Sequence, residues 1–152
     1  MIPFPELLSD PSPAIGTFIQ SASPEFLEAS AYAGFRFAAI DLEHASFGTE
    51  TLVHLIRAGE AAGLSMLARV PGLDAALIKK SLDMGAAGII VPNIDTPEQA
   101  AEALEAGASL IEVRDGLVRQ GPQFVSKIQK YLLNLVKNER SNPREDSPAP
   151  EA

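Results

Sequence analysis

The chain has no cysteine and no tryptophan among its 152 residues, and aromatic residues make up only 6% of it. The lack of cysteine excludes disulfides, thiolate zinc sites, iron–sulfur clusters and a cysteine nucleophile, and nothing points to an oxidising compartment. Hydrophobic residues nevertheless reach 46%. A core can therefore form, mainly from alanine, leucine, isoleucine and valine, and disorder is excluded for most of the chain.

Positive charge is also scarce, because 12 lysines and arginines stand against 20 acidic residues and leave a net charge of −8. Such a field opposes a nucleic-acid partner. The sequence has no signal-peptide pattern at its start and no run of about 18 apolar residues. We therefore expect one domain in a cytoplasmic protein, with no nucleic acid and no membrane as partner.

Between residues 14 and 138, short apolar runs alternate with helical segments that end at glycine. The runs predict strands at 14–20, 35–44, 65–71, 87–94 and 108–116, with a helix after each. This alternation is typical of parallel βα units. Five units can form an open doubly wound sheet or an incomplete β/α barrel, and the pattern alone does not choose. Residues 1–13 are expected to be a lead-in and 139–152 a disordered tail, since the tail has no large apolar residue.

Chemically active side chains cluster where the predicted strands end. Asp41, Glu43 and His44 close the second strand, and Arg69 closes the third. The later ends carry Pro92-Asn93 and the segment 112–115. Because the carboxyl ends of parallel strands meet at one crevice, this pattern predicts a site. The alternative is a noncatalytic rim, in which His44 is structural and Arg69 pairs with Glu43. No GxGxxG or GxxxxGK motif is present, so the glycines are assigned to turns.

Three motifs together resemble the HpcH/HpaI aldolase family: DLEHASFG (41–48), ARVPG (68–72) and LDMGAAGIIVPNIDTPEQA (82–100). The family contains 4-hydroxy-2-oxoheptanedioate and 2-keto-3-deoxy sugar acid aldolases, and the likeness runs from about residue 14 to 106. It implies an α/β fold of the (β/α)8 TIM-barrel type, here incomplete, with about five parallel βα units. It also implies a carbon–carbon lyase that acts on 2-keto acids through a metal-bound pyruvate enolate.

The resemblance implies a role for each matching residue. His44 falls on the catalytic histidine, Arg69 on the arginine at the pyruvate end of the substrate, and Asp83 on the acid that orients the histidine. Asp41 and Glu43 fall on acidic positions in the polar network around the metal. The chemistry agrees, because cleavage needs a base for the substrate hydroxyl and a positive charge beside the developing enolate.

The likeness changes after residue 106, where the two strands that carry the family's metal ligands have no counterpart. Glu112 is the only candidate to replace the metal-binding glutamate for Mg²⁺, Mn²⁺ or Co²⁺. Residues 105–132 instead resemble the C-terminal end of dihydroorotate dehydrogenases, whose turn holds the FMN phosphate. In this chain Asp115 occupies that turn, and its carboxylate would repel a phosphate.

The resemblance implies a 2-keto acid and an aldehyde as small-molecule partners. The strand pattern itself predicts a homo-oligomer, because an open five-stranded sheet leaves two edges and an apolar face that a second copy can cover. Two alternatives stay open. The first is an inactive barrel fragment that serves as an oligomerisation or interaction module, favoured by the missing metal ligands. The second is a flavin or phosphate binder that uses residues 114–121.

Overall fold

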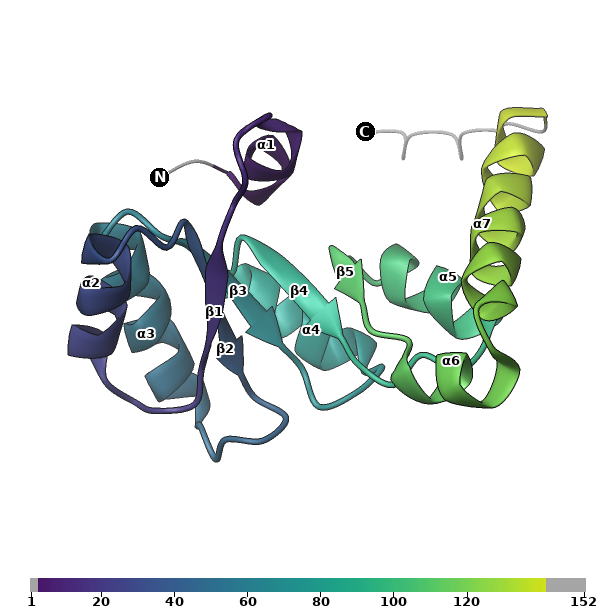
Figure 1. Cartoon of the computed structure of the whole chain (residues 1–152). Helices are drawn as coiled ribbons and strands as arrows, with labels where there is room; N and C mark the ends of the chain where they lie inside the picture. Colours follow the sequence, from purple (N-terminus) through teal and green to yellow (C-terminus); the bar gives the residue numbers. More distant parts are fainter. Residues whose placement is uncertain (1–2, 142–152) are drawn as a thin grey trace, which may run out of the picture.

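The computed structural model describes residues 3–141 (Figure 1). Its five strands are β1 (Gly16–Ile19), β2 (Phe37–Asp41), β3 (Ser65–Arg69), β4 (Gly88–Val91) and β5 (Leu110–Ile111). The helices are α1 (Phe4–Ser9), α2 (Pro24–Tyr32), α3 (Thr49–Ala61), α4 (Ala75–Asp83), α5 (Pro97–Glu105), α6 (Arg114–Gln120) and α7 (Gln123–Ser141). The predicted alternation of strands and helices is confirmed. Within the described residues, no helix is both long enough and apolar enough to cross a membrane.

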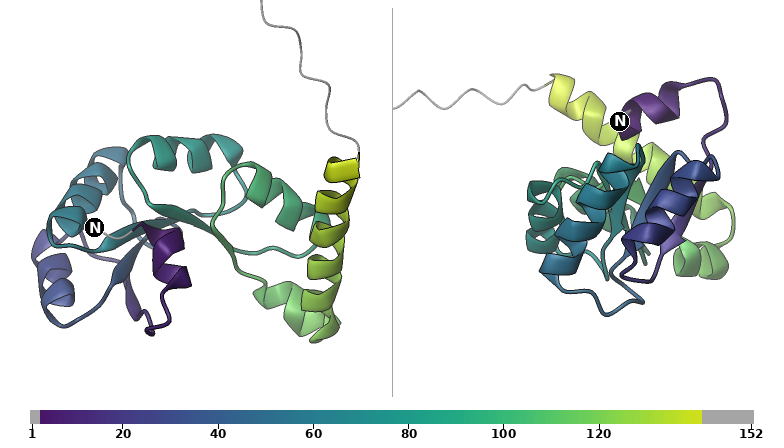
Figure 2. Two further views of the ribbon diagram at one scale, coloured as in Figure 1. Left: turned by 90° about the horizontal axis from the view of Figure 1, so that it is seen from above. Right: turned by 90° about the vertical axis from the view of Figure 1, so that its left-hand side faces the viewer.

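The order of the strands decides between the two architectures. All neighbours are parallel, and the sheet runs β1-β2-β3-β4-β5 in sequence order. A doubly wound sheet would reverse direction at a switch point, which this order excludes. Crossovers of one hand that always step the same way place their helices on one face. Accordingly α2 to α5 follow the outer side of the curved sheet (Figure 2). The fold is an incomplete (β/α)8-type barrel.

The helices begin at side-chain caps and end at glycines, and both signals are visible in the sequence. The hydroxyl of Ser23 accepts the backbone N–H of the third helical residue of α2, and Asp74 accepts two N–H groups at the start of α4. Thr96 and Gln99 form a capping box that opens α5. At the other end, α3 stops before Gly63, whose φ of 91° is strained for any other residue.

Each strand has two faces, and alternate residues belong to different cores. Outward residues such as Ala38 and Ile40 join the large core beneath the helices. Inward residues form a second, smaller cluster on the concave face with side chains of α1: Phe4, Leu7, Ala39, Leu67 and Ile90. The same alternation puts residues 41 and 69 on the concave face, at the carboxyl ends of their strands.

The segment 1–13, predicted as a lead-in, contains a short helix that the sequence analysis did not predict. Residues 4–9 form α1, and its side chains Phe4 and Leu7 are each only 2% exposed. A six-residue helix is too short to show a helical period in the sequence. It forms here because the open concave face offers apolar surface to bury.

The C-terminal segment also differs from the prediction. The strand predicted at 108–116 shrinks to the two residues of β5, and α6 follows at once. The segment 114–121, which the alternative of a flavin or phosphate binder would use, is therefore largely helix α6. It is packed so closely that a Cβ on Gly116 would lie 2.2 Å from the ring of Phe124. Helix α7 continues to Ser141. The rest of the predicted tail, residues 142–152, lies outside the described residues.

Candidate functional site

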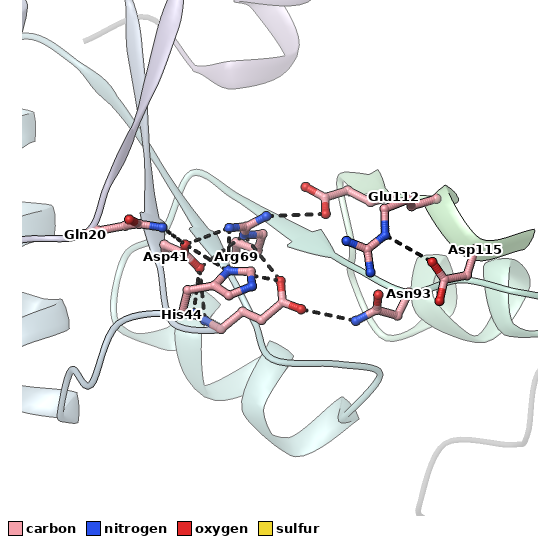
Figure 3. A network of polar contacts seen from close by, with 9 residues as sticks. Gln20, Asp41, His44, Arg69, Asn93, Glu112 and Asp115 are labelled. Carbon is pink, nitrogen blue, oxygen red and sulfur yellow. Dashed lines mark hydrogen bonds and ion pairs between the residues drawn. The ribbon is translucent and has the colours of Figure 1, made fainter. Parts of the chain in front are cut away.

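The centre of the site is an ion pair that strand register creates. Asp41 and Arg69 are Cα partners at the ends of β2 and β3, and both side chains point to the concave face. The guanidinium donates twice to the carboxylate, from Nε to Oδ1 at 3.1 Å and from Nη2 to Oδ2 at 2.6 Å (Figure 3). This bidentate geometry is the strongest form of the arginine–carboxylate pair.

Asp41 is completely buried and accepts further hydrogen bonds. The Gln20 amide donates at 2.6 Å, and the backbone N–H groups of Glu43 and His44 donate at 3.1 and 3.2 Å. Burial penalises the charged carboxylate, but the hydrogen bonds from Arg69, Gln20 and His44 outweigh it, so the pKa of Asp41 lies well below its usual range. The same pairing raises the pKa of Arg69. Asp41 thus stays ionised and fixes the turn that carries His44.

Two neighbours compete for one nitrogen of His44. Its Nδ1 lies 2.9 Å from Arg69 Nη2 and 3.3 Å from Asp41 Oδ2. Because an arginine only donates, the shorter contact places the ring proton on Nε2. A proton on Nδ1 would instead be donated to Asp41 and leave Nε2 as a free base. The imidazole side chain is 57% exposed, so this second nitrogen is accessible.

The outer wall of the site comes from the ends of β4 and β5. Asn93 Nδ2 donates to Glu43 Oε1 at 3.2 Å, and Glu112 Oε2 lies 3.6 Å from Arg69 Nη1. Asn93 is the only residue other than glycine with a positive φ, 60°, among residues 3–141. Such strain is often concentrated at functional sites. A cavity of about 260 Å³ is lined by Glu43, His44, Arg69, Pro92, Asn93, Glu112 and Arg114.

A second, apolar cavity of about 320 Å³ lies on the concave face and also reaches Glu112. Its wall includes Phe18, whose ring lies 4.5 Å from the Cζ of Arg69. The guanidinium is therefore held on its plane by an aromatic face and on one edge by a carboxylate. This arrangement leaves the Nη1 side of Arg69 facing the polar cavity.

The structure brings together five of the six predicted site residues: Asp41, Glu43, His44, Arg69 and Glu112. Asp83 does not join them. It is the last, exposed residue of α4, which leads into the amino end of β4, whereas the cluster lies at the carboxyl ends. Within one chain the carboxylate beside the His44 ring is therefore Asp41, and the role predicted for Asp83 stays a prediction.

Two contacts of the central pair were not predicted. Gln20 directly follows β1. The sequence indicates it only as a polar residue at the end of an apolar run. Phe18 reads as a core residue of β1, yet its ring stacks on Arg69. Neither pairing is visible in the sequence, because each depends on strands that are adjacent only in the folded sheet.

The carboxylates form one group with metal-ligand spacing. Ligand atoms of Asp41, Glu43 and His44 lie within 4.8 Å of one another. However, both oxygens of Asp41 already accept hydrogen bonds, and His44 Nδ1 faces Arg69. A cation there would also meet the positive guanidinium, which lies 3.6 Å from Glu43. In this arrangement the described residues do not fit a divalent ion, and Glu112 is outside the group.

Comparison with known proteins gives a consistent picture. The family model of the HpcH/HpaI aldolase/citrate lyase family matches residues 14–120. A 2-dehydro-3,6-dideoxy-6-sulfogluconate aldolase of Pseudomonas putida is 35% identical over 100 residues, which cover 66% of this chain and 39% of the relative. The crystal structure of an HpcH/HpaI aldolase from Desulfitobacterium hafniense superposes with a TM-score of 0.60 at 30% identity, over 64% of this chain and 38% of that one.

A dihydroorotate dehydrogenase from Eimeria tenella is similar in fold alone, with a TM-score of 0.57 and 12% identity over 85% of this chain and 61% of that one. The chain spans only part of the curated aldolases that it matches, between 36% and 52% of their length.

Proposed function

Because this chain belongs to the HpcH/HpaI aldolase/citrate lyase family, we propose that it is an aldolase-type carbon–carbon lyase that acts on 2-keto acids. The observation that carries the proposal is the cluster at the carboxyl ends of β2 and β3. There an exposed imidazole and a guanidinium line one polar cavity, and the buried, ionised carboxylate of Asp41 holds the guanidinium from behind. These are the groups that an enolate reaction requires.

In the cleavage direction, His44 acts in its second tautomer, in which Nδ1–H donates to Asp41 in place of the contact with Arg69 Nη2. Nε2 is then unprotonated and accepts the proton of the 4-hydroxyl group. The C3–C4 bond then breaks, its electron pair moves towards the 2-oxygen, and the aldehyde leaves. The positive charge of the Arg69 guanidinium stabilises the negative charge that develops on the resulting enolate. The proton held by His44 returns to C3 and yields pyruvate, so atoms and charge balance without any other reactant.

The test is pyruvate release from a 4-hydroxy-2-keto acid, measured with lactate dehydrogenase as coupling enzyme. Removing a positioned general base costs typically about 10²- to 10⁴-fold in rate. We expect a loss in that range for His44→Ala. His54 is the matched control, since it is exposed on α3 and its ionic partner among residues 3–141 is Glu50 at 3.8 Å. A wild-type protein without activity, or equal effects of the two substitutions, contradicts the proposal.

The same assay addresses the metal that the family resemblance implies. Mg²⁺, Mn²⁺ and Co²⁺ are each added to protein stripped with a chelator. Because Arg69 already neutralises the carboxylates, we expect turnover to change less than twofold. A strict requirement for one of these ions would contradict the conclusion that this arrangement of residues does not fit a divalent ion.

A second candidate function follows from the open concave face. The apolar cavity lies between the two edge strands β1 and β5, and the chain spans about two fifths of the first curated relatives. The alternative is an inactive half-barrel that serves as an interaction module by pairing with a second copy. Light scattering after size exclusion tests it, because a monomer at micromolar concentration rejects the pairing.

A further inference from the structure

The two edges of the Arg69 guanidinium are used unequally. Nε and Nη2 donate the hydrogen bonds to Asp41, and Nη2 also contacts His44. Nη1 makes no hydrogen bond to any described residue. Its nearest ionic neighbour is Glu112 Oε2 at 3.6 Å, beyond hydrogen-bond distance. This edge therefore keeps two donors for an anion that comes closer than Glu112 does.

The Glu112 side chain is held only by that loose contact. Its backbone is fixed, because its N–H donates to Val91 and its carbonyl accepts from Ile94, both at 2.9 Å. Its carboxylate, in contrast, has no hydrogen-bond partner among residues 3–141, and the side chain is 37% exposed. It can turn into water without breaking a hydrogen bond or moving the chain.

The other two carboxylates near Arg69 do not have this freedom. Asp41 is buried and accepts from several donors. Glu43 faces Nε rather than Nη1, is 19% exposed, and is held by the amide of Asn93. Glu112 is the only one of the three that is half-exposed, unheld and placed on the Nη1 edge.

We propose that Glu112 is a specificity-determining residue, which occupies the anion position on Arg69 Nη1 in the free protein and is displaced by the carboxylate of a bound 2-keto acid. The identity of the ligand rests on the proposed function, whereas the displacement rests on the geometry. Glu112 thereby selects for ligands that carry a carboxylate, because a neutral carbonyl compound cannot replace the ion pair that it breaks.

The test is calorimetric titration of the full chain with oxalate, a planar dianion with the shape of a pyruvate enolate, without metal. An exposed ion pair of ordinary strength predicts that Glu112→Gln binds oxalate about two- to fivefold more tightly than wild type. Glu112→Asp is the matched control. It keeps the charge but is one methylene shorter, so it reaches Nη1 less well and should also tighten binding.

Several outcomes overturn the inference. Tightening in Glu112→Gln but not in Glu112→Asp would show a general charge effect, and unchanged or weaker binding in both would exclude competition. Binding that weakens in Glu112→Gln only when Mg²⁺ is added would make Glu112 a metal ligand. Failure of wild type and both variants to bind millimolar oxalate would mean that the Nη1 edge is no anion site. One outcome separates the two proposals. If both Glu112 variants bind oxalate more tightly than wild type but no pyruvate is released in the activity assay, the lyase proposal is rejected and the displacement of Glu112 is supported.

Discussion

Asp41 and Glu112 are both carboxylates that face Arg69, but they lie in opposite surroundings. Asp41 ends the interior strand β2, is fully buried, and contacts Arg69 at 2.6 Å. Glu112 follows the two-residue edge strand β5, is partly exposed, and stays 3.6 Å from the same guanidinium. One end of the cluster is therefore fixed by the sheet, while the other end can adjust.

The difference shows that the two sides of the site are held by strand pairings of different length. The β2–β3 pairing has five residue pairs and fixes the positions of His44 and Arg69. The β4–β5 pairing, which Glu112 follows, has only two. A rigid pair preserves charge and orientation, and a loose rim admits ligands. The predictions that follow test this contrast between the Asp41 side and the Glu112 side of Arg69, from the strongest contact to the weakest.

The largest effect is expected from Asp41→Asn. The substitution keeps the shape but leaves Arg69, which is 14% exposed, without its buried counter-ion. Breaking such a pair from one side costs about 3 to 5 kcal/mol in the free energy of unfolding. Urea unfolding followed by circular dichroism measures it. A loss below about 1 kcal/mol would mean that Glu43 and Glu112 take over the pairing and that the centre is not rigid.

Acid should destabilise the protein through the same carboxylate. The pKa of Asp41 is lowered in the folded state relative to its ordinary value of 3.8, so its contribution is complete above that value and is lost as the pH falls towards the folded pKa. Urea midpoints from pH 7 down to about 2.5 measure the loss. Because other carboxyls also titrate, Asp41→Asn is the reference. Equal acid slopes in the two proteins would contradict the assignment.

A moderate effect is expected from Phe18→Leu, which removes the ring that stacks on Arg69. The substitution should lower the free energy of unfolding by about 0.5 to 1 kcal/mol beyond lost apolar contact. Phe26→Leu is the control for the lost apolar contact, because Phe26 on α2 is exposed to nearly the same extent as Phe18, 48% against 46%. Thermal melting of both variants measures the difference, and identical melting temperatures would show that the stacking contributes nothing.

The smallest effect on stability is expected from Glu112→Gln. Its contact with Arg69 is long and solvent-exposed, so the free energy of unfolding should change by less than about 0.5 kcal/mol. Urea unfolding under the conditions used for Asp41→Asn gives the direct comparison. A loss as large as that of Asp41→Asn would mean that the two ends of the cluster are equally rigid.

Prediction from sequence succeeded where the signal is local. Caps such as Thr96 and the terminal glycines predicted where the helices begin and end, and apolar runs predicted the strands. Together they were enough to predict the alternation of parallel βα units. Asp41, His44 and Arg69 were found because they end such runs. It failed where packing decides. α1 is too short to show a helical period. The end of the strand predicted at 108–116 became the start of α6, in which Gly116 allows close packing on Phe124.

The sequence by itself determined which residues stand at the carboxyl ends of the strands, since each strand and its following turn are encoded within a few neighbouring positions. Only the tertiary structure decided which of these side chains meet. Register aligned Asp41 with Arg69, placed Asp83 at the other end of the sheet, and brought Glu112 to the free edge of the guanidinium. The physical reason is that pairing between strands depends on burying both faces of the sheet, a condition set by the whole chain.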